Sequence, residues 1–441
     1  MASVRTSDSL TRRRDYVTTF IAEGLFILSY LVVFRLVADH FGPRGFGEYA
    51  LARRTLAFLL PIGAIGLDIA IARYVAYAAG RPVEQRAYLP AALVLLAAAV
   101  GLQAAVLLAF QDFWGGLFFG SSAYVSLVAP MVVLVAGNAL FAVAYGNLRG
   151  HLRITEANVL RVVVHAVVPL GAALFVRDSV SSLLFVMGGG WVVLSAGALA
   201  ATRMSIDKPI SRAAELARYS LPRVPGDLLA LVLFAVPGII VAHVADITVA
   251  GQVAFGIAGL GMVASAVYPV GFVLLPVASR LLASGSVERL RAQVFGVARV
   301  VIVLIIVSIA IFEVFATPIV SAYLGPAFAG SVTTLRILML GALPWGVYIS
   351  LRSVIDARHK RAVNAINVAV SFAVFTVLMV VLQIWVEAAT AVVPVFVLSL
   401  YVLGTLTAIE VVRIARTGAP TLVDDAGAEP GPGESAAEPM L

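Results

Sequence analysis

The fold of this chain is decided by residues 16–80, which read YVTTFIAEGLFILSYLVVFRLVADHFGPRGFGEYALARRTLAFLLPIGAIGLDIAIARYVAYAAG. Two apolar runs flank a short turn at residues 40–47, and each is long enough to cross a bilayer core of about 30 Å, which takes about 20 helical residues. An ionised side chain at mid-bilayer costs about 2.5 to 3.5 kcal/mol, so charges inside such runs indicate a function. The charges of interest are Glu23, Arg35, Arg53, Arg54, Asp68 and Arg73.

Similar apolar runs recur along the whole chain. Hydrophobic residues make up 61% of it and charged residues 12%, with a mean hydropathy of +1.01, whereas soluble domains contain about 25% charged residues. We therefore predict an all-α polytopic membrane protein of about twelve transmembrane helices; the strands of a β-barrel would alternate apolar and polar residues, and these runs do not. The predicted spans are 16–39, 49–79, 87–110, 122–146, 155–176, 181–202, 219–244, 249–276, 293–314, 329–352, 361–384 and 388–413.

The positions of Arg and Lys predict the orientation in the membrane. Basic residues recur in alternate connections, for example at 12–14 and at Arg149 and Arg153, whereas the opposite connections contain only Arg44 and Arg177. We expect both termini to be cytoplasmic and the protein to be a multi-pass protein of the cytoplasmic membrane. Retention of basic loops in the cytoplasm accounts for the net charge of +7, so no nucleic-acid partner is implied.

A basic connection at residues 203–218 separates six predicted spans from six. A shift of about 203 residues aligns Tyr145–Arg149, which ends span 4, with Tyr348–Arg352, which ends span 10. Duplicated halves with an even number of spans are parallel in the membrane and usually enclose a central cavity. The predicted organisation is a cytoplasmic N-terminus at 1–15, a six-helix bundle at 16–202, a cytoplasmic linker at 203–218, a second six-helix bundle at 219–413 and a disordered cytoplasmic tail at 414–441.

The sequence lacks the usual signals of enzymes and metalloproteins. It contains no cysteine, its five histidines are scattered, and it has no P-loop or HExxH motif. The predicted connections are also too short to hold a soluble catalytic domain. We expect no enzyme activity, no cofactor and no metal site.

Polar residues inside spans are the candidates for a binding site. Arg54, Pro61 and Asp68 are spaced by seven, which places them near one stripe of a helix over about 21 Å. Arginines that face a cavity can bind an anion, and phosphate favours the bidentate guanidinium. Arg35, Arg53 and Arg54 lie near the outer ends of spans 1 and 2, where snorkelling to the interface is the alternative.

Further candidates lie in spans 5, 7 and 10. Arg161 and His165 are four residues apart and share one face of span 5, and Arg336 lies in the outer half of span 10. Glu23 and Asp227 are carboxylates inside spans 1 and 7. They are candidates for proton or sodium coupling, or for ion-pair partners of arginines such as Arg73 and Arg223.

Three segments resemble the polysaccharide biosynthesis proteins of the Wzx type. Residues 35–49, RLVADHFGPRGFGEY, are similar to the pattern that joins helices 1 and 2 of that family; residues 215–222, ELARYSLP, resemble the start of its second half; and residues 323–328, YLGPAF, with 335–338, LRIL, resemble the segment that leads into its helix 10. One departure is Pro237-Gly238, where such proteins often have an Asp-Arg pair.

The resemblance implies a fold shared with MATE exporters and lipid II flippases, and translocation of a polyprenyl-diphosphate-linked oligosaccharide by alternating access. The implied partners are the lipid-linked oligosaccharide, membrane lipids and glycan-assembly proteins. The cavity candidates Arg35, Arg53, Arg54, Asp68, Arg161, His165 and Arg336 would then hold the diphosphate and its glycan. The alternatives are a MATE-like cation-coupled exporter of small amphipathic compounds, which would rely on buried carboxylates, and a membrane scaffold for glycan assembly.

Overall fold

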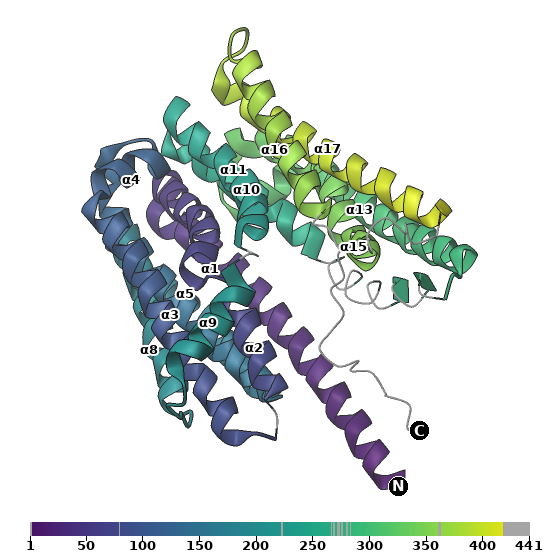
Figure 1. Ribbon diagram of the computed structural model, residues 1–441. Coiled ribbons are helices and arrows are strands. Elements are labelled where there is room, and N and C mark those ends of the chain that lie inside the picture. The colour runs from purple at the N-terminus through teal and green to yellow at the C-terminus, as the bar shows by residue number, and fades with distance from the viewer. Residues whose placement is uncertain are drawn as a thin grey trace, which may run out of the picture.

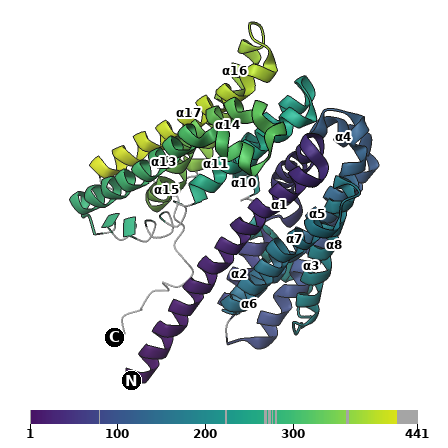
Figure 2. The same ribbon diagram turned by 180° about the vertical axis from the view of Figure 1, so that it is seen from behind.

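The computed structural model is almost entirely helical in its described part, which comprises residues 2–417 except 79, 222–223, 266, 268–269, 271–273, 275–276, 279–280, 283 and 360–362. Figures 1 and 2 show two groups of helices that meet at the end of the molecule opposite the N-terminus and diverge toward the end that carries it. We call the first group, α1 to α9, the N-lobe and the second, α10 to α17, the C-lobe. The predicted all-α, two-bundle class is thereby confirmed.

The N-lobe is built from long apolar helices. Its helices are α1 (Ala2–Ala64), α2 (Leu67–Tyr77), α3 (Pro82–Ala109), α4 (Gln111–Phe119), α5 (Val128–Gly150), α6 (Ile154–Val162), α7 (Val168–Phe175), α8 (Val180–Ala200) and α9 (Pro209–Ser220). A 3-10 turn, Ser122–Leu127, precedes α5, and a π-helical turn, Val163–Val167, joins α6 to α7. Helix α9, which forms most of the predicted linker at 203–218, packs on α2 and α3 of the N-lobe.

The C-lobe is also built from apolar helices. Its helices are α10 (Val224–Val244), α11 (Ile247–Ser265), α13 (Val287–Tyr323), α14 (Val332–Leu340), α15 (Ala342–Arg358), α16 (Val363–Leu382) and α17 (Ala388–Thr417), with a 3-10 turn at Pro326–Ser331 before α14. Helix α17 continues to Thr417, and the rest of the predicted tail lies outside the described residues.

Ten helical segments of the described chain are long and apolar enough to cross a membrane. The first of them, Ile21–Ala64, covers most of predicted span 1 and about half of predicted span 2, and the apolar part of α10, Leu228–Val244, is shorter than the others. The predicted turn at 40–47 is tighter than expected. The only non-helical backbone inside α1 is at Gly42, whose φ of 65° lies in the left-handed region that glycine adopts without a steric penalty. The chain therefore turns between spans 1 and 2 at a single residue.

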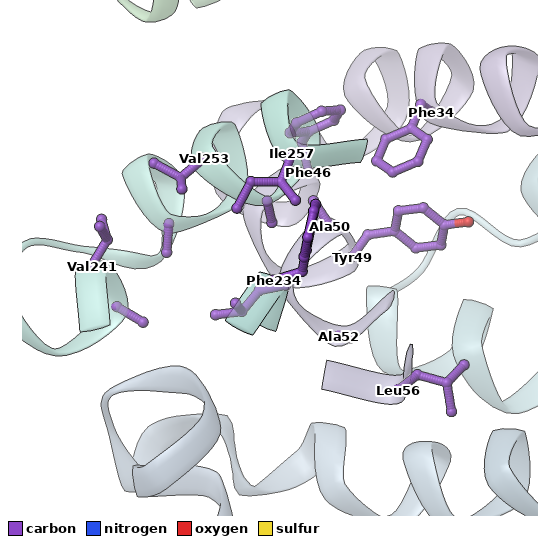
Figure 3. Packing of buried hydrophobic residues seen from close by; sticks show 14 of the residues in the cluster. Phe34, Phe46, Tyr49, Ala50, Ala52, Leu56, Phe234, Val241, Val253 and Ile257 are labelled. Atoms are coloured by element: carbon purple, nitrogen blue, oxygen red, sulfur yellow. The ribbon is translucent and has the colours of Figure 1, made fainter. Parts of the chain in front are cut away.

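The lobes touch through the backbone near this turn. A Cβ atom on Gly251 of α11 would lie 2.1 Å from the Cα of Gly47 in α1, so only a pair of glycines allows the two helices to approach this closely. Aromatic rings surround the contact: Phe255 packs against Phe34 and Phe46 with ring centroids 5.2 and 5.4 Å apart. Figure 3 shows this cluster of buried side chains at the interface between the lobes.

Candidate functional site

A cavity of about 380 Å³ lies between the two lobes, and we call it the central cavity. The N-lobe contributes the charged side chains of its lining, which all come from α1: Glu23, Arg53 and Arg54. The C-lobe contributes apolar side chains from α10, α11 and α15. These are Ala230, Leu231, Phe234, Ala254, Ile257, Ala258, Met262 and Trp345, together with Gly261.

Arg54 spans the gap between the lobes. Its Nε donates a hydrogen bond of 2.8 Å to the backbone carbonyl of Phe234, and its guanidinium lies 5.1 Å from the centroid of the Phe234 ring. Arg53 lies against aromatic rings of its own lobe, 5.1 Å from the Tyr30 centroid and 6.0 Å from that of Trp191. Within the described residues neither arginine has a carboxylate partner. The cavity therefore presents two uncompensated cations, and anions are the ligands that such a site attracts.

A second cavity of about 380 Å³ lies within the N-lobe, and we call it the N-lobe cavity. Phe26, Arg53 and Ala57 line both cavities, so the two adjoin. The remaining lining residues are Leu56, Leu60, Asp68, Asn138, Phe141, Ala142, Tyr145, Arg161, His165 and Trp191.

His165 lies in the π-helical turn between α6 and α7. Its ring meets Phe141 and Trp191 edge-on, with centroids 4.3 and 4.9 Å away. A π-turn inserts one extra residue into a helix and frequently occurs at a functional site. Here it accompanies a polar side chain that faces the N-lobe cavity beside Arg161, as the four-residue spacing predicted.

Glu23 is paired rather than free. Its Oε2 lies 2.7 Å from a terminal nitrogen of Arg161, whose guanidinium also lies 5.5 Å from the centroid of Phe26. The partner is therefore Arg161 and not Arg73, which lies 4.6 Å from the ring centroid of Tyr219 instead. Because Arg161 neutralises the charge of Glu23, the net charge of the central cavity comes from Arg53 and Arg54.

Two of the predicted cavity arginines line neither cavity. Arg35 pairs with Asp39 at 3.0 Å and donates a hydrogen bond of 2.6 Å to the carbonyl of Tyr323, so it joins the lobes where they meet. Arg336 lies 3.6 Å from Glu313 of α13, within the C-lobe. Each arginine has a neighbouring carboxylate. The i,i+4 spacing of Arg35 and Asp39 can be read from the sequence, whereas the pairing of Arg336 with Glu313 cannot. The side chain of the predicted coupling residue Asp227 lies outside the described residues.

The prediction that Arg54, Pro61 and Asp68 lie along one stripe of a continuous helix is wrong. Helix α1 ends at Ala64, and α2 begins at Leu67 after Ile65 and Gly66, which have φ values of 42° and 68°. Because the helix breaks between Pro61 and Asp68, Arg54 faces the central cavity and Asp68 faces the N-lobe cavity. At the break, Gly66 adopts the left-handed backbone that glycine permits, whereas Ile65 adopts it against its steric preference.

The sequence alone did not single out the aromatic residues of the two cavities. In the sequence, nothing in the periodicity of the spans distinguishes these residues from other apolar ones. They are Tyr30, Phe141, Tyr145, Trp191 and Phe234. Asn138 carried a signal, since an amide in the middle of predicted span 4 is costly unless it faces a cavity or a partner.

Comparison of the folds identifies transporters as structural neighbours. No protein-family model matches the chain, and no curated protein matches its sequence. An inward-facing multidrug resistance MATE family transporter of the MOP superfamily superposes with a TM-score of 0.76 at 13% identity, covering 89% of this chain and 96% of that one.

Two other solved structures extend this comparison. An outward-facing MATE family transporter of the MOP superfamily gives a TM-score of 0.60 at 14% identity over 92% of this chain and 94% of that one. The lipid II flippase MurJ, in an inward closed conformation, gives 0.68 at 12% identity over 90% and 87%. At these identities the similarity shows the fold and leaves the substrate open. The chain is thus a multi-pass membrane protein with the two-lobed fold of the MOP-superfamily transporters.

Proposed function

We propose that this protein is a flippase that carries a polyprenyl-diphosphate-linked oligosaccharide across the cytoplasmic membrane by alternating access, with both termini in the cytoplasm. The observation that supports this most is the pair Arg53 and Arg54, which face the central cavity without a carboxylate partner among the described residues. A diphosphate carries several oxygens that a planar guanidinium can bind with two parallel hydrogen bonds.

The two walls of the central cavity suit the two ends of such a lipid. The N-lobe wall is charged and polar, whereas the C-lobe wall is apolar, with Leu231, Phe234, Ile257 and Trp345 among its residues. A diphosphate at Arg53 and Arg54 would leave the polyprenyl chain free to leave between the lobes into the bilayer. Membrane lipids and glycan-assembly proteins are its expected partners, and no enzyme activity is required.

The test removes both arginines. We expect Arg53→Ala with Arg54→Ala to abolish translocation of a lipid-linked glycan in proteoliposomes, because each charge-assisted hydrogen bond contributes about 1.5 to 3 kcal/mol. The control is Arg289→Ala with Arg291→Ala, which removes the same charge from exposed positions in the first turns of α13 and should transport normally. Normal transport by the Arg53/Arg54 variant at wild-type membrane abundance would refute the assignment.

The second candidate is a cation-coupled exporter of small amphipathic compounds. Its support is that MATE family transporters are among the structural neighbours. Such an exporter would depend on cavity carboxylates, here Glu23 and Asp68. Drug accumulation in a deletion strain separates the two candidates, because only the exporter predicts a rise. A scaffold for glycan assembly predicts that the arginine variant stays active.

A further inference from the structure

The N-lobe cavity contains polar groups that nothing in the described protein satisfies. Asn138 of α5 and His165 of the π-turn are both half-buried, and neither forms a hydrogen bond with any described residue. Trp191 is 1% exposed, and its indole N–H also lacks a partner in the described chain. An unsatisfied buried polar group costs about 1 to 3 kcal/mol, a cost that applies to the Trp191 N–H. Asn138 and His165 are half-buried and line the cavity, so their polar groups are available to a ligand with hydrogen-bonding groups.

Flat apolar surfaces alternate with these polar groups. Phe141 and Tyr145 stack on each other with centroids 5.3 Å apart and an interplanar angle of 24°. The edge-on contacts of His165 with Phe141 and Trp191 extend this surface into a wall of rings. A ligand that fits both features has an apolar face and a polar rim. A pyranose ring has this form, since its C–H bonds lie on its faces and its hydroxyl groups around its edge.

The charges of the cavity indicate where an anionic group would lie. Arg53 and Arg161 both line it, and Asp68 is the one carboxylate in its lining. Glu23 pairs with Arg161, so Arg53 is the arginine of this lining that has no carboxylate partner among the described residues, and it attracts the anionic group of a ligand that carries a neutral ring. Arg53 also lines the central cavity, so a ligand whose anionic group lies at Arg53 can extend a neutral ring from there into the N-lobe.

We propose that the N-lobe cavity binds the lipid-proximal sugar ring of the glycan, with Asn138 and His165 hydrogen-bonded to its hydroxyl or acetamido groups and the aromatic wall against its face. The proposal rests on the proposed function and assigns the part of the substrate that the N-lobe recognises. The volume of about 380 Å³ lies at the lower end of the range for ligand pockets, about 300 to 1,000 Å³. The cavity therefore recognises the first ring or rings, and the distal glycan lies outside it.

The experiment compares two lipids that differ only in the sugar. Binding of undecaprenyl diphosphate and of undecaprenyl-diphospho-N-acetylglucosamine to the purified protein in detergent is measured by isothermal titration, together with the glucosyl and galactosyl analogues. We expect at least one glycosylated lipid to bind about tenfold more tightly than the bare diphosphate, as about one or two additional hydrogen bonds would give. Asn138→Leu with His165→Phe should remove this difference and change the affinity for the bare lipid by less than about twofold.

Matched variants separate recognition from stability. Asn138→Gln keeps the amide and should retain part of the preference. His243→Phe replaces an exposed histidine at the end of α10, outside both cavities, and should retain all of it. If the double variant does not fold, Asn138→Leu alone carries the test, because Asn138 is only half-buried.

The outcomes distinguish the two proposals. Equal affinity of the wild type for the bare lipid and for all glycosylated lipids overturns the sugar site and leaves the flippase assignment intact. A preference that persists in the Asn138/His165 variant also overturns the sugar site. Absence of binding to any of these lipids overturns both proposals.

Discussion

At the scale of single residues, the site depends on which charges are paired. Arg35 and Arg336 each lie beside a carboxylate outside the two cavities, and Arg161 is held by Glu23. Arg53 and Arg54 contact aromatic rings and a backbone carbonyl instead. In a medium of low dielectric constant an unpaired guanidinium attracts an anion far more strongly than it would in water. Whether an arginine stabilises the fold or is available to bind a ligand therefore depends on its partners in the structure. Its position within a predicted span does not decide this.

The ion pair of Glu23 and Arg161 leads to a prediction that a substitution increases the affinity for the ligand. Glu23→Gln removes the negative charge nearest the central cavity and frees Arg161, so binding of undecaprenyl diphosphate should become tighter, by about fivefold if the electrostatic gain is about 1 kcal/mol. Isothermal titration measures this change. The control is Glu23→Gln with Arg161→Gln, which removes both members of the pair and should bind with nearly wild-type affinity. An unchanged or weaker affinity of the Glu23→Gln single variant would mean that the pair does not set the field of the cavity.

At the scale of elements, the irregular parts of the helices surround the N-lobe cavity. The break between α1 and α2 separates Pro61 from Asp68, and the π-turn holds His165. Non-helical backbone inside a membrane is tolerated where it is buried in protein or lines a cavity, which is the case here. Ile65 has a φ of 42°, unusual for a β-branched residue, so the surrounding packing maintains the break at an energetic cost.

The glycine contact between α1 and α11 determines how tightly the lobes close. Gly251→Ala would place a Cβ atom 2.1 Å from the Gly47 Cα, and backbone cannot yield as a flexible side chain does. We expect this variant to shift the population away from the closed contact seen here and to slow transport. Because the chain has no cysteine, spin labels on two introduced cysteines, at residues 44 and 243, can report the distance between the lobes by pulsed EPR.

The control for this variant is Gly261→Ala, a glycine of the same helix where an added Cβ meets no atom within 4 Å. Its distance distribution should match that of the wild type. An unchanged distribution for Gly251→Ala would show that the contact does not limit closure.

At the scale of the whole molecule, the orientation of the protein in the membrane determines the side toward which the two lobes open. The lobes meet at the end opposite the N-terminus and diverge toward the N-terminal end. With cytoplasmic termini, as the basic connections predict, this arrangement opens toward the cytoplasm. The higher TM-score with the inward-facing MATE structure than with the outward-facing one agrees with that view.

Labelling of single introduced cysteines tests the orientation. In intact cells, a membrane-impermeant maleimide should label a cysteine at exposed Asp178, between α7 and α8, and not one at Lys208, just before α9, which should react only after permeabilisation. The cysteine-free parent is the control for background labelling. The reverse pattern would invert the membrane orientation and with it the predicted direction of opening.

The sequence by itself determined the fold class, most of the helical spans and the charged residues that line the cavities. These features depend on composition and on the cost of placing charges in a bilayer, and both can be read from a linear chain. Arg53, Arg54, Asp68, Arg161 and His165 were all found in this way. The single-residue turn at Gly42 and the break at Ile65 and Gly66 were not, because backbone dihedral angles are set by the packing of neighbouring helices.

Only the tertiary structure decided which charges are neutralised and which walls face each other. The partner of Glu23 is 138 positions away in the chain, at Arg161, and Arg54 donates to a carbonyl of the other lobe. Likewise the aromatic wall of the N-lobe cavity combines residues from α5, α8 and the π-turn, whose spacing in the sequence is that of any apolar span. Pairing and cavity formation are contacts between distant segments. Charge and hydropathy along the chain constrain such contacts without specifying them.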